Sequence, residues 1–200
     1  HILKENNFYS EDMEHDACGV GIIASTEGKK SRKVVEYGIE ALKAVWHRGA
    51  VDADGKTGDG AGIHVEIPKD FFIEKIEVTG HTHDNSEICV GMIFLPRNDY
   101  AAQESCKTIV ESELTKNDFS IYGWRQVPVN PKVLGEKAFQ TMPEIIQVLF
   151  KPYDPELTNK DLERKIYETR RKIENEAFKK SLNNFYICSL SSKSIIYKGM

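Results

Sequence analysis

The sequence predicts a layered fold of mixed α-helices and β-strands, either α+β or α/β. Short apolar runs rich in Ile, Val and Phe recur along the chain and are typical of buried strands. Amphipathic segments of about 15 to 20 residues lie between them and are typical of helices. Strands in runs that are interrupted by such helices indicate a layered body. Two hundred residues suffice for one domain with a sizeable core.

The first fifty residues combine a polar arm, an apolar run and a helix. Residues 1–17 are polar and aperiodic, and we expect an extended leader. The run "GVGIIA" at 19–24 predicts an interior strand. Residues 31–47 predict a helix with Ser31 as its N-cap and Gly49 available just after its end. Its expected core stripe has helical spacing and consists of Val35, Ile39, Leu42 and Trp46.

The middle of the chain begins with a turn-rich segment. Residues 49–62, "GAVDADGKTGDGAG", hold five glycines and three aspartates and lead into an alternating strand at 63–67. A second buried strand is expected at 87–95, before Pro96. An amphipathic helix is expected at 99–115 with Asp99 as its cap. Its inward residues are expected to be Ala102, Cys106, Ile109, Val110 and Leu114.

The last eighty residues predict four more strands and one long helix. Strands are expected at 120–129 and 144–150. The charged segment 158–181 predicts a helix with a narrow apolar face, and 184–190 and 194–199 predict a final strand pair around the turn "SSKS". The apolar face of the long helix is expected to consist of Leu162, Ile166, Ile173 and Ala177.

Composition and charge exclude several classes of function. A net charge of −4 and a pI near 5.9 provide no basic patch, which argues against a nucleic-acid partner. No apolar run approaches the ~20 residues that span a bilayer, and the first residues lack the apolar core of a secretory signal. We therefore expect a cytoplasmic protein. The four cysteines lack the spacing of a zinc site or a disulfide framework, and we expect free thiols at Cys18, Cys89, Cys106 and Cys188.

Cys18, in "HDACGVG", has two interpretations. Most cysteines beside a strand are buried structural residues. Cys18, however, lies at the junction of leader and fold, and Gly19 and Gly21 leave the backbone around it uncrowded. If the bond between Ala17 and Cys18 were cut, the new α-amino group, with a pKa of about 7.7–8.0, could act as the general base for the thiol. Cys18 is thus a candidate nucleophile that depends on this cleavage.

Two further motifs are candidates for a site. Arg48 in "WHRGA" either ends a helix, where a cation is favourable, or positions groups near the nucleophile with its planar guanidinium. Asp59 and Gly60 lie in "TGDGAG", which has neither the P-loop nor the dinucleotide-binding pattern. Two interpretations remain open. The segment is either a tight loop that brings backbone close to a small polar substrate, or a plain surface turn. The aspartates of 49–62 also lack the spacing of a calcium loop.

The remaining polar residues are weaker candidates. His64 lies on an expected strand and is interpreted as structural. His81 and His83 could bind a metal adventitiously, but they occupy a polar loop with no evident third ligand. Cys188 is expected in the core. No metal site is predicted.

Five blocks together carry a resemblance to a known family. They are "EHDACGVGIIAS", "GIEALKAVWHRGAVDADGKTGDGAGIHVEIPKDFF", "YGWRQVPVN", "LGEKA" and "FYICSLSSKSIIYKGM". In this order and spacing they resemble the class II glutamine amidotransferase domain that begins the large subunit of glutamate synthases. The resemblance covers nearly the whole chain.

The resemblance implies the N-terminal-nucleophile (Ntn) hydrolase fold, a four-layer αββα sandwich. It implies that residues 1–17 are a propeptide, that cleavage between Ala17 and Cys18 frees the nucleophile, and that 18–200 are the N-terminal part of the domain. Cys18 would attack the side-chain amide of glutamine, forming a glutamyl thioester and ammonia. Arg48 would support the region of the nucleophile, and Asp59 and Gly60 match the adjoining loop.

The resemblance also implies properties of a longer parent protein. Ammonia would reach a distant site and combine there with 2-oxoglutarate, using FMN, an iron–sulfur cluster and electrons from NADPH or ferredoxin. No cofactor is expected within this segment. The expected partners are glutamine, the remaining domains of the large subunit and a small NADPH-oxidising subunit. A plastid is the alternative location in a photosynthetic eukaryote.

The resemblance further implies that the oxyanion-hole pair and the substrate-binding arginine and aspartate follow Met200. Removal of one oxyanion-hole donor typically lowers the turnover rate about 10²–10³-fold. We therefore expect the 200-residue chain alone to be inactive as a glutaminase. Two alternatives remain: the amidotransferase domain of another glutamine-dependent enzyme, such as the amidophosphoribosyltransferase class, and a non-catalytic truncated remnant.

Overall fold

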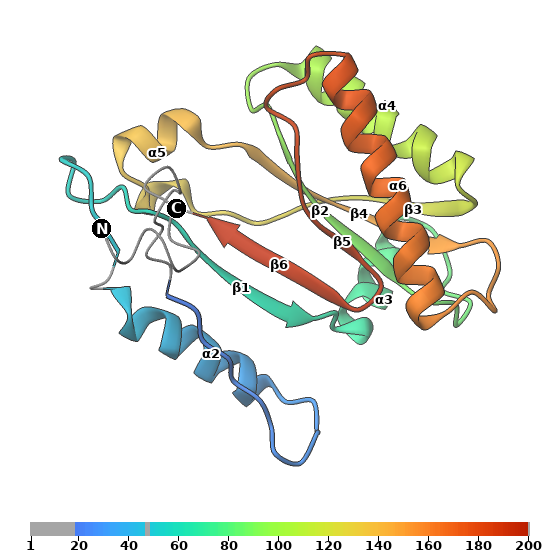
Figure 1. The fold of residues 1–200 in the computed structure, drawn as a ribbon, viewed down its shortest axis with the longest axis horizontal. Coiled ribbons are helices and arrows are strands. Elements are labelled where there is room, and N and C mark those ends of the chain that lie inside the picture. Colours follow the sequence, from blue (N-terminus) through green and yellow to red (C-terminus); the bar gives the residue numbers. More distant parts are fainter. Residues whose placement is uncertain (1–18, 47–48, 200) are drawn as a thin grey trace, which may run out of the picture. The chain divides into compact units, whose positions relative to one another are not determined.

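The computed structural model describes residues 19–46 and 49–199. The chain divides into two compact units, His1–Arg48 and Gly49–Met200. Both sheets belong to the second unit, and the first unit contributes one described helix (Figure 1).

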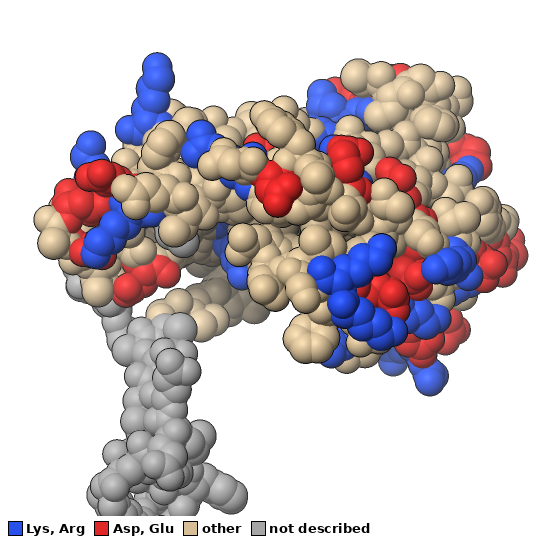
Figure 2. Space-filling view, turned by 90° about the horizontal axis from the view of Figure 1, so that it is seen from above, with Lys and Arg blue, Asp and Glu red and all other residues tan. Residues whose placement is uncertain are grey.

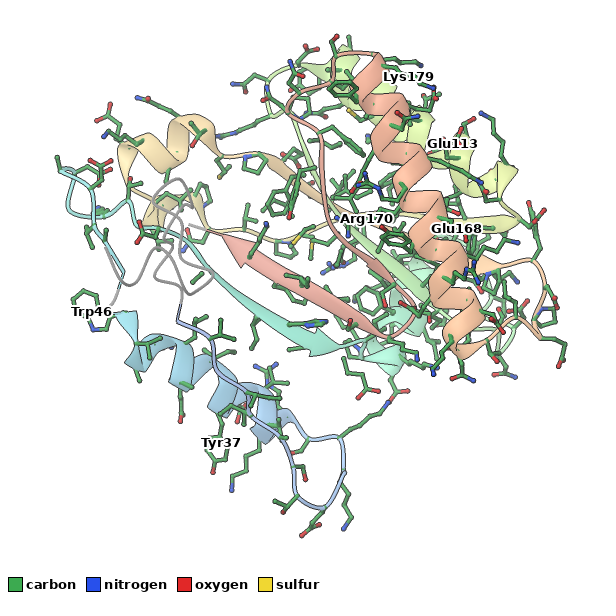
Figure 3. The ribbon with its side chains drawn as sticks, viewed as in Figure 1. Tyr37, Trp46, Glu113, Glu168, Arg170 and Lys179 are labelled. Atoms are coloured by element: carbon green, nitrogen blue, oxygen red, sulfur yellow. The ribbon has the colours of Figure 1, made fainter. Side chains whose placement is uncertain are left out.

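Helix α2 (Arg32–Ala44) begins where the sequence predicts. The Ser31 hydroxyl oxygen accepts a hydrogen bond from the Lys33 amide at 3.2 Å, so it satisfies a free donor of the first turn. The predicted end at residue 47 is wrong, because Val45 is the C-cap. Trp46 lies beyond the helix and is 72% exposed, so its assignment to a core stripe is also wrong (Figure 3). The other three stripe residues are half-buried: Val35, Ile39 and Leu42.

The predicted strand at 19–24 does not form, which corrects the sequence analysis. These residues have no regular secondary structure, and Val20 and Ile22 are 94% and 90% exposed. A strand obtains its backbone hydrogen bonds from a neighbour, and no strand pairs with residues 19–24 in the described part of the chain. An apolar run alone therefore does not produce a strand here.

The second unit contains two antiparallel sheets (Figure 1). The first has four strands in the order β3-β4-β2-β5, and the second pairs β1 with β6. In chain order the strands are β1 (Ala61–Glu66), β2 (Cys89–Leu95), β3 (Phe119–Gln126), β4 (Glu144–Pro152), β5 (Tyr186–Ser191) and β6 (Ser194–Gly199).

Strand β2 has a continuously apolar sequence, and the packing on its two faces explains this pattern. Successive side chains of a strand point to opposite faces of the sheet. Cys89, Ile93 and Leu95 belong to one hydrophobic cluster, and Val90 and Met92 belong to a second cluster on the opposite face. Since both faces are covered, every position of the strand favours an apolar residue.

Helices α4 (Tyr100–Lys116) and α6 (Asn159–Lys179) pack on one face of the four-stranded sheet (Figure 1). The predicted cap of α4 is confirmed, because Asp99 Oδ1 accepts from the Ala102 amide at 2.9 Å. The predicted apolar faces are confirmed as well. The buried residues are Cys106, Ile109, Val110 and Leu114 of α4 and Leu162, Ile166, Ile173 and Ala177 of α6; Ala102 is half-buried.

Helix α3 (Lys69–Val78) and the β1–β6 sheet cover the other face. Phe72 and Ile76 are completely buried in the second cluster, together with Leu149 and Ile195. The sequence pattern does not predict helix α3. The helix follows Pro68, which makes no side-chain cap hydrogen bond, so the usual start signal is absent.

The last two strands belong to different sheets, which corrects the predicted strand pair. β5 ends the four-stranded sheet, and β6 pairs with β1. Glu163 of α6 fixes the connection between them: its carboxylate accepts from the Ser191 hydroxyl at 2.9 Å and from the Ser192 amide at 2.7 Å. The turn signal in the sequence marks the crossing between the sheets and not a hairpin within one sheet.

The second unit thus has three consecutive layers: helices α4 and α6, the four-stranded sheet, and the β1–β6 sheet with α3. This arrangement confirms an α+β fold and is consistent with part of an Ntn-hydrolase domain. Helix α5 (Glu136–Thr141) and the 3-10 turn η2 (Pro131–Val133) precede β4. Within the described ranges, no helix has both the length and the apolar character to cross a membrane. Positive and negative side chains are interspersed on the face drawn in Figure 2.

Candidate functional site

The structure describes two of the predicted site residues, Asp59 and Gly60. Ala17, Cys18 and Arg48 lie outside the described residues. Asp59 and Gly60 belong to the segment that leads from residue 49 into β1, directly after the "HR" of "WHRGA" in the sequence.

The segment from 50 to 59 folds into a small hairpin-like loop. Val51 and Gly58 form an isolated antiparallel bridge, and the Asp52 amide donates to the Thr57 carbonyl at 2.8 Å. At the tip, the Gly55 amide donates to the Asp52 carbonyl at 2.9 Å, and Gly55 has a φ of +69°. We call residues 50–59 the site loop.

The Asp54 side chain holds the tip of the site loop together. Its Oδ1 accepts from the Lys56 and Thr57 amides at 2.9 and 2.7 Å, and its Oδ2 accepts from the Thr57 hydroxyl at 2.5 Å. These donors, with the Thr57 hydroxyl first, hold the pKa of the Asp54 carboxyl well below its usual range. Asp54 is therefore a structural anion of the loop.

Asp59 closes the base of the site loop. Its Oδ2 accepts from the Ala50 amide at 2.7 Å. A hydrogen bond to an ionised acceptor is stronger than one between neutral groups. Ala50 is two residues after Arg48, so the Asp59 carboxylate fixes the backbone that follows the predicted arginine.

Gly60 allows the loop to meet the β1–β6 sheet. Its φ is +89°, in the region that favours glycine. A Cβ at this position would lie 3.0 Å from the Gly199 carbonyl oxygen, and the next residue, Ala61, pairs with Gly199 in the sheet. The glycine is therefore required by the backbone geometry.

The site loop also contacts the start of α5, about eighty residues later in the chain. Lys137 Nζ donates to Asp52 Oδ2 at 2.6 Å, and this bond lowers the pKa of the Asp52 carboxyl. The Ala138 amide donates to Thr57 Oγ1 at 3.4 Å. Gly135 lies so close to the loop that a Cβ on it would be 2.3 Å from Asp54 Oδ2 and from Thr57 Oγ1.

The sequence does not single out these contact residues as site residues. Asp54 is one of the aspartates that lack the spacing of a calcium loop, and Gly135 and Lys137 lie within the "LGEKA" block. The one local signal is a glycine immediately before a short helix. The contact joins segments distant in sequence, which no local periodicity can indicate.

The three described cysteines are free and buried, as expected for structural thiols. Burial raises the pKa of Cys89 well above its usual value and that of Cys106 to about 11. Burial also raises the pKa of Cys188, whose Sγ lies 3.4 Å from the Ile196 carbonyl oxygen. Thiols of this kind are poor nucleophiles near neutral pH.

The three histidines with described positions, His64, His81 and His83, have separate surroundings. His64 Nε2 is 2.6 Å from the Ser194 hydroxyl on the neighbouring strand, a contact that joins β1 and β6. His81 Nδ1 is 3.1 Å from the Thr79 hydroxyl, and His83 Nδ1 is buried with no hydrogen-bond partner. Among the residues with described positions, no group of three potential ligands could hold a metal ion.

Comparison with known proteins shows the family. The family model described as "Glutamine amidotransferases class-II" matches residues 18–200. The chain belongs to the class II glutamine amidotransferases. The matched region of this amidotransferase includes the site loop, its contact with α5 and both sheets.

Among curated relatives, the amidotransferase chain is similar to two kinds of glutamate synthase. It is 54% identical to the "Glutamate synthase [NADPH] large chain" of Azospirillum brasilense over 99% of this chain. It is 38% identical to the chloroplastic "Ferredoxin-dependent glutamate synthase" of Spinacia oleracea over 100% of this chain. It spans only 13% and 12% of the length of these two relatives.

Proposed function

We propose that this chain is the glutamine-hydrolysing part of a glutamate synthase. One observation carries the proposal: the amidotransferase is 54% identical, over 99% of its residues, to a large chain of glutamate synthase. Its reaction would release ammonia from the side-chain amide of glutamine.

Cys18 is the proposed nucleophile, and residues 1–17 are the proposed propeptide. Hydrolysis of the Ala17–Cys18 bond leaves Cys18 with a free α-amino group that accepts the thiol proton. The thiolate attacks the amide carbon of glutamine, the C–N bond breaks, and ammonia leaves with that proton. Water then attacks the thioester, which releases glutamate and restores the thiol.

The other cysteines support this choice. The sequence contains four cysteines, and Cys89, Cys106 and Cys188 are buried with raised pKa values. A buried thiol with a high pKa offers neither access nor thiolate at neutral pH. Cys18 is the remaining thiol, and it is the first residue matched by the family model.

Asp59 and Arg48 are proposed to organise the region around the nucleophile. Asp59 is a positioning residue, since its carboxylate holds the Ala50 amide and with it the backbone after Arg48. The Arg48 guanidinium is proposed to orient backbone or carboxylate groups near Cys18. Gly60 acts through the turn that it permits.

The activity of the whole enzyme is proposed for a longer protein. There, ammonia would combine with 2-oxoglutarate at a site with FMN and an iron–sulfur cluster, using NADPH or ferredoxin. The described residues do not fit such a cluster, because no three potential ligands lie together. The proposed partners are the other domains of the large subunit and a small NADPH-oxidising subunit, and the proposed location is the cytoplasm or a plastid.

The test compares glutamine-dependent and ammonia-dependent glutamate formation in the full-length protein that contains these residues. The Cys18→Ala variant should lose glutamine-dependent activity and keep ammonia-dependent activity, because only the release of ammonia needs the thiol. If Cys18→Ala retains glutamine-dependent activity, the nucleophile is elsewhere. If the wild type forms glutamate from neither nitrogen source, the assignment to glutamate synthase is wrong.

A further inference from the structure

We propose that the outer face of α3, together with Arg125 of β3, is a docking surface for an acidic segment of the longer protein. We call this surface the α3 face, and it consists of Phe71, Lys75, Val78 and Arg125. The inference rests on the proposed function, in which this chain is one part of a longer glutamate synthase. It concerns residues of the second unit alone.

Helix α3 has one exposed row of side chains that is apolar at both ends. Residues three and four positions apart are neighbours on a helix surface, so Phe71, Lys75 and Val78 form a single row. Phe72 and Ile76 are completely buried on the core side of the helix. Phe71 and Val78 are 36% and 82% exposed. The row therefore presents apolar surface to solvent on either side of a cation.

Two cations converge on the Phe71 ring. Lys75 Nζ lies 4.9 Å from the ring centre, and Arg125 Cζ lies 5.2 Å from the same point. Each cation is attracted by the ring, but two like charges at this range repel each other. Neither Lys75 nor Arg125 forms an ion pair with any residue whose position is described. The α3 face thus has two positive charges that lack a carboxylate.

The local sequence explains why no carboxylate neutralises these charges. Positions 71, 72, 78 and 79, which are three or four residues from Lys75, hold no acidic residue. The acidic residues of α3 occupy positions 70, 74 and 77, on an adjacent row of the helix. Arg125 lies opposite Gln147 in the register of β3 and β4, so its cross-strand neighbour is neutral. An anion for this surface must therefore come from another segment.

The Arg125 side chain is already held in place. Its Nη1 donates to Gln147 Oε1 at 2.8 Å, and Gln147 is completely buried. Gln147 Nε2 in turn donates to the Tyr197 hydroxyl at 3.4 Å. A guanidinium group has five N–H donors in a rigid fork that matches a carboxylate. The remaining donors of Arg125 are positioned to receive one.

The chemistry of the α3 face fits a protein partner with carboxylate side chains. Aromatic residues and arginine are enriched in protein interfaces, and charges across an interface are complementary. A net charge of −4 argues against a nucleic acid as the anion. The chain spans 13% of the length of its relative in Azospirillum brasilense, so the longer protein supplies many further segments. We infer that one of these segments places Asp or Glu beside Lys75 and Arg125 and an apolar residue beside Val78.

The experiment is zero-length cross-linking of the full-length protein. A water-soluble carbodiimide joins a lysine amine to a carboxylate in contact with it, and peptide mass spectrometry identifies both residues. We expect Lys75 to be joined to an Asp or Glu that lies outside the 200 residues of this chain. The ion pair between Lys165 and Asp118, at 2.8 Å, is the internal positive control.

A matched pair of variants tests the position of the surface. Val78→Glu adds a negative charge to the α3 face and should slow the Lys75 cross-link about 10-fold, because like charges across an interface repel. Phe178→Glu adds the same charge at a position of similar exposure, 80%, and should leave the rate unchanged. Phe178 belongs to α6, which packs on the opposite face of the four-stranded sheet.

Arg125→Gln tests the second cation. It should slow the Lys75 cross-link about 10-fold, because a hydrogen bond to a charged group is lost. The Lys165–Asp118 cross-link should persist in all three variants and shows that the domain remains folded.

The outcomes separate this inference from the proposed function. A cross-link from Lys75 to a segment outside the 200 residues, slowed by Val78→Glu and Arg125→Gln but not by Phe178→Glu, supports the α3 face. Cross-links from Lys75 only to carboxylates within the 200 residues or to another chain, or none while Lys165 reacts, would overturn it. Equal rates in Val78→Glu and the wild type would also overturn it. Each of these results leaves the proposed function intact, because that function fails only if glutamine-dependent glutamate formation is absent or independent of Cys18.

Discussion

Replacement of Gly60 by alanine tests whether the site loop requires this backbone geometry. Gly60 has a φ of +89°, and a Cβ would lie 3.0 Å from the Gly199 carbonyl oxygen. A non-glycine residue in such a sparsely populated region costs about 1–3 kcal/mol. Gly199 is the partner of Ala61 in the β1–β6 sheet, so a shift of its backbone away from residue 60 would disturb that pairing. We expect Gly60→Ala to lower the free energy of unfolding by about 2 kcal/mol.

Thermal unfolding of the chain, followed by circular dichroism, measures this loss. For a domain of this size, about 2 kcal/mol corresponds to a decrease in Tm of about 4–8 °C. Gly58→Ala is the matched control, because Gly58 has no positive φ and its Cβ would lie 3.5 Å from the Ala50 carbonyl oxygen, an ordinary contact. A Gly→Ala change without strain stabilises by about 0.4–1 kcal/mol.

The comparison within one loop decides between two explanations. If Gly58→Ala keeps the wild-type Tm or raises it while Gly60→Ala lowers it, the left-handed conformation is the cause. Equal losses in both variants would refute the reasoning, because the loop would then be sensitive to any added methyl group.

Three further predictions concern thiol chemistry, the core and the site loop. With a pKa of about 11, only about 10⁻³ of the Cys106 thiol is ionised at pH 8. Iodoacetamide should therefore modify Cys106 about 200-fold more slowly than an ordinary thiol with a pKa of about 8.5. Comparable modification rates, measured by peptide mass spectrometry, would contradict the burial of Cys106. Phe150→Ala should lower the free energy of unfolding, measured with denaturant, by about 3–5 kcal/mol because Phe150 is completely buried. The control Phe178→Ala, at an 80% exposed position, should change it by less than about 0.5 kcal/mol. The ionised Asp54 carboxyl should stabilise the loop at any pH above its ordinary pKa of about 3.9, and this stabilisation should be lost only as the pH falls well below that value. Thr57→Val should raise the pKa of Asp54 in an NMR titration. An unchanged pKa would show that the Thr57 hydroxyl is not the main partner of the carboxylate.

Periodicity predicted the elements whose burial follows from local sequence. The helix from 159 to 179 buries the four residues that its spacing indicates, and Asp99 caps its helix as a short-range signal predicts. The strand from 89 to 95 was recognisable because both of its faces are covered.

The predictions that failed depend on partners elsewhere in the chain. Residues 19–24 have the composition of a strand, but no neighbouring strand pairs with them in the described part of the molecule. The turn after β5 looks like a hairpin, but Glu163 of a distant helix fixes it as a crossing between sheets. The contact between Gly135 and the site loop likewise joins segments about eighty residues apart. Such pairings are tertiary and leave no local pattern.

The central claim is that Cys18 acts as an N-terminal nucleophile. The most direct measurement combines the intact mass of the full-length protein with mapping of the residue that 6-diazo-5-oxo-norleucine labels. We predict one label per chain, on a peptide that begins at Cys18 with a free α-amino group and lacks residues 1–17. An active protein that retains residues 1–17, or a label on Cys89, Cys106 or Cys188, would contradict the account.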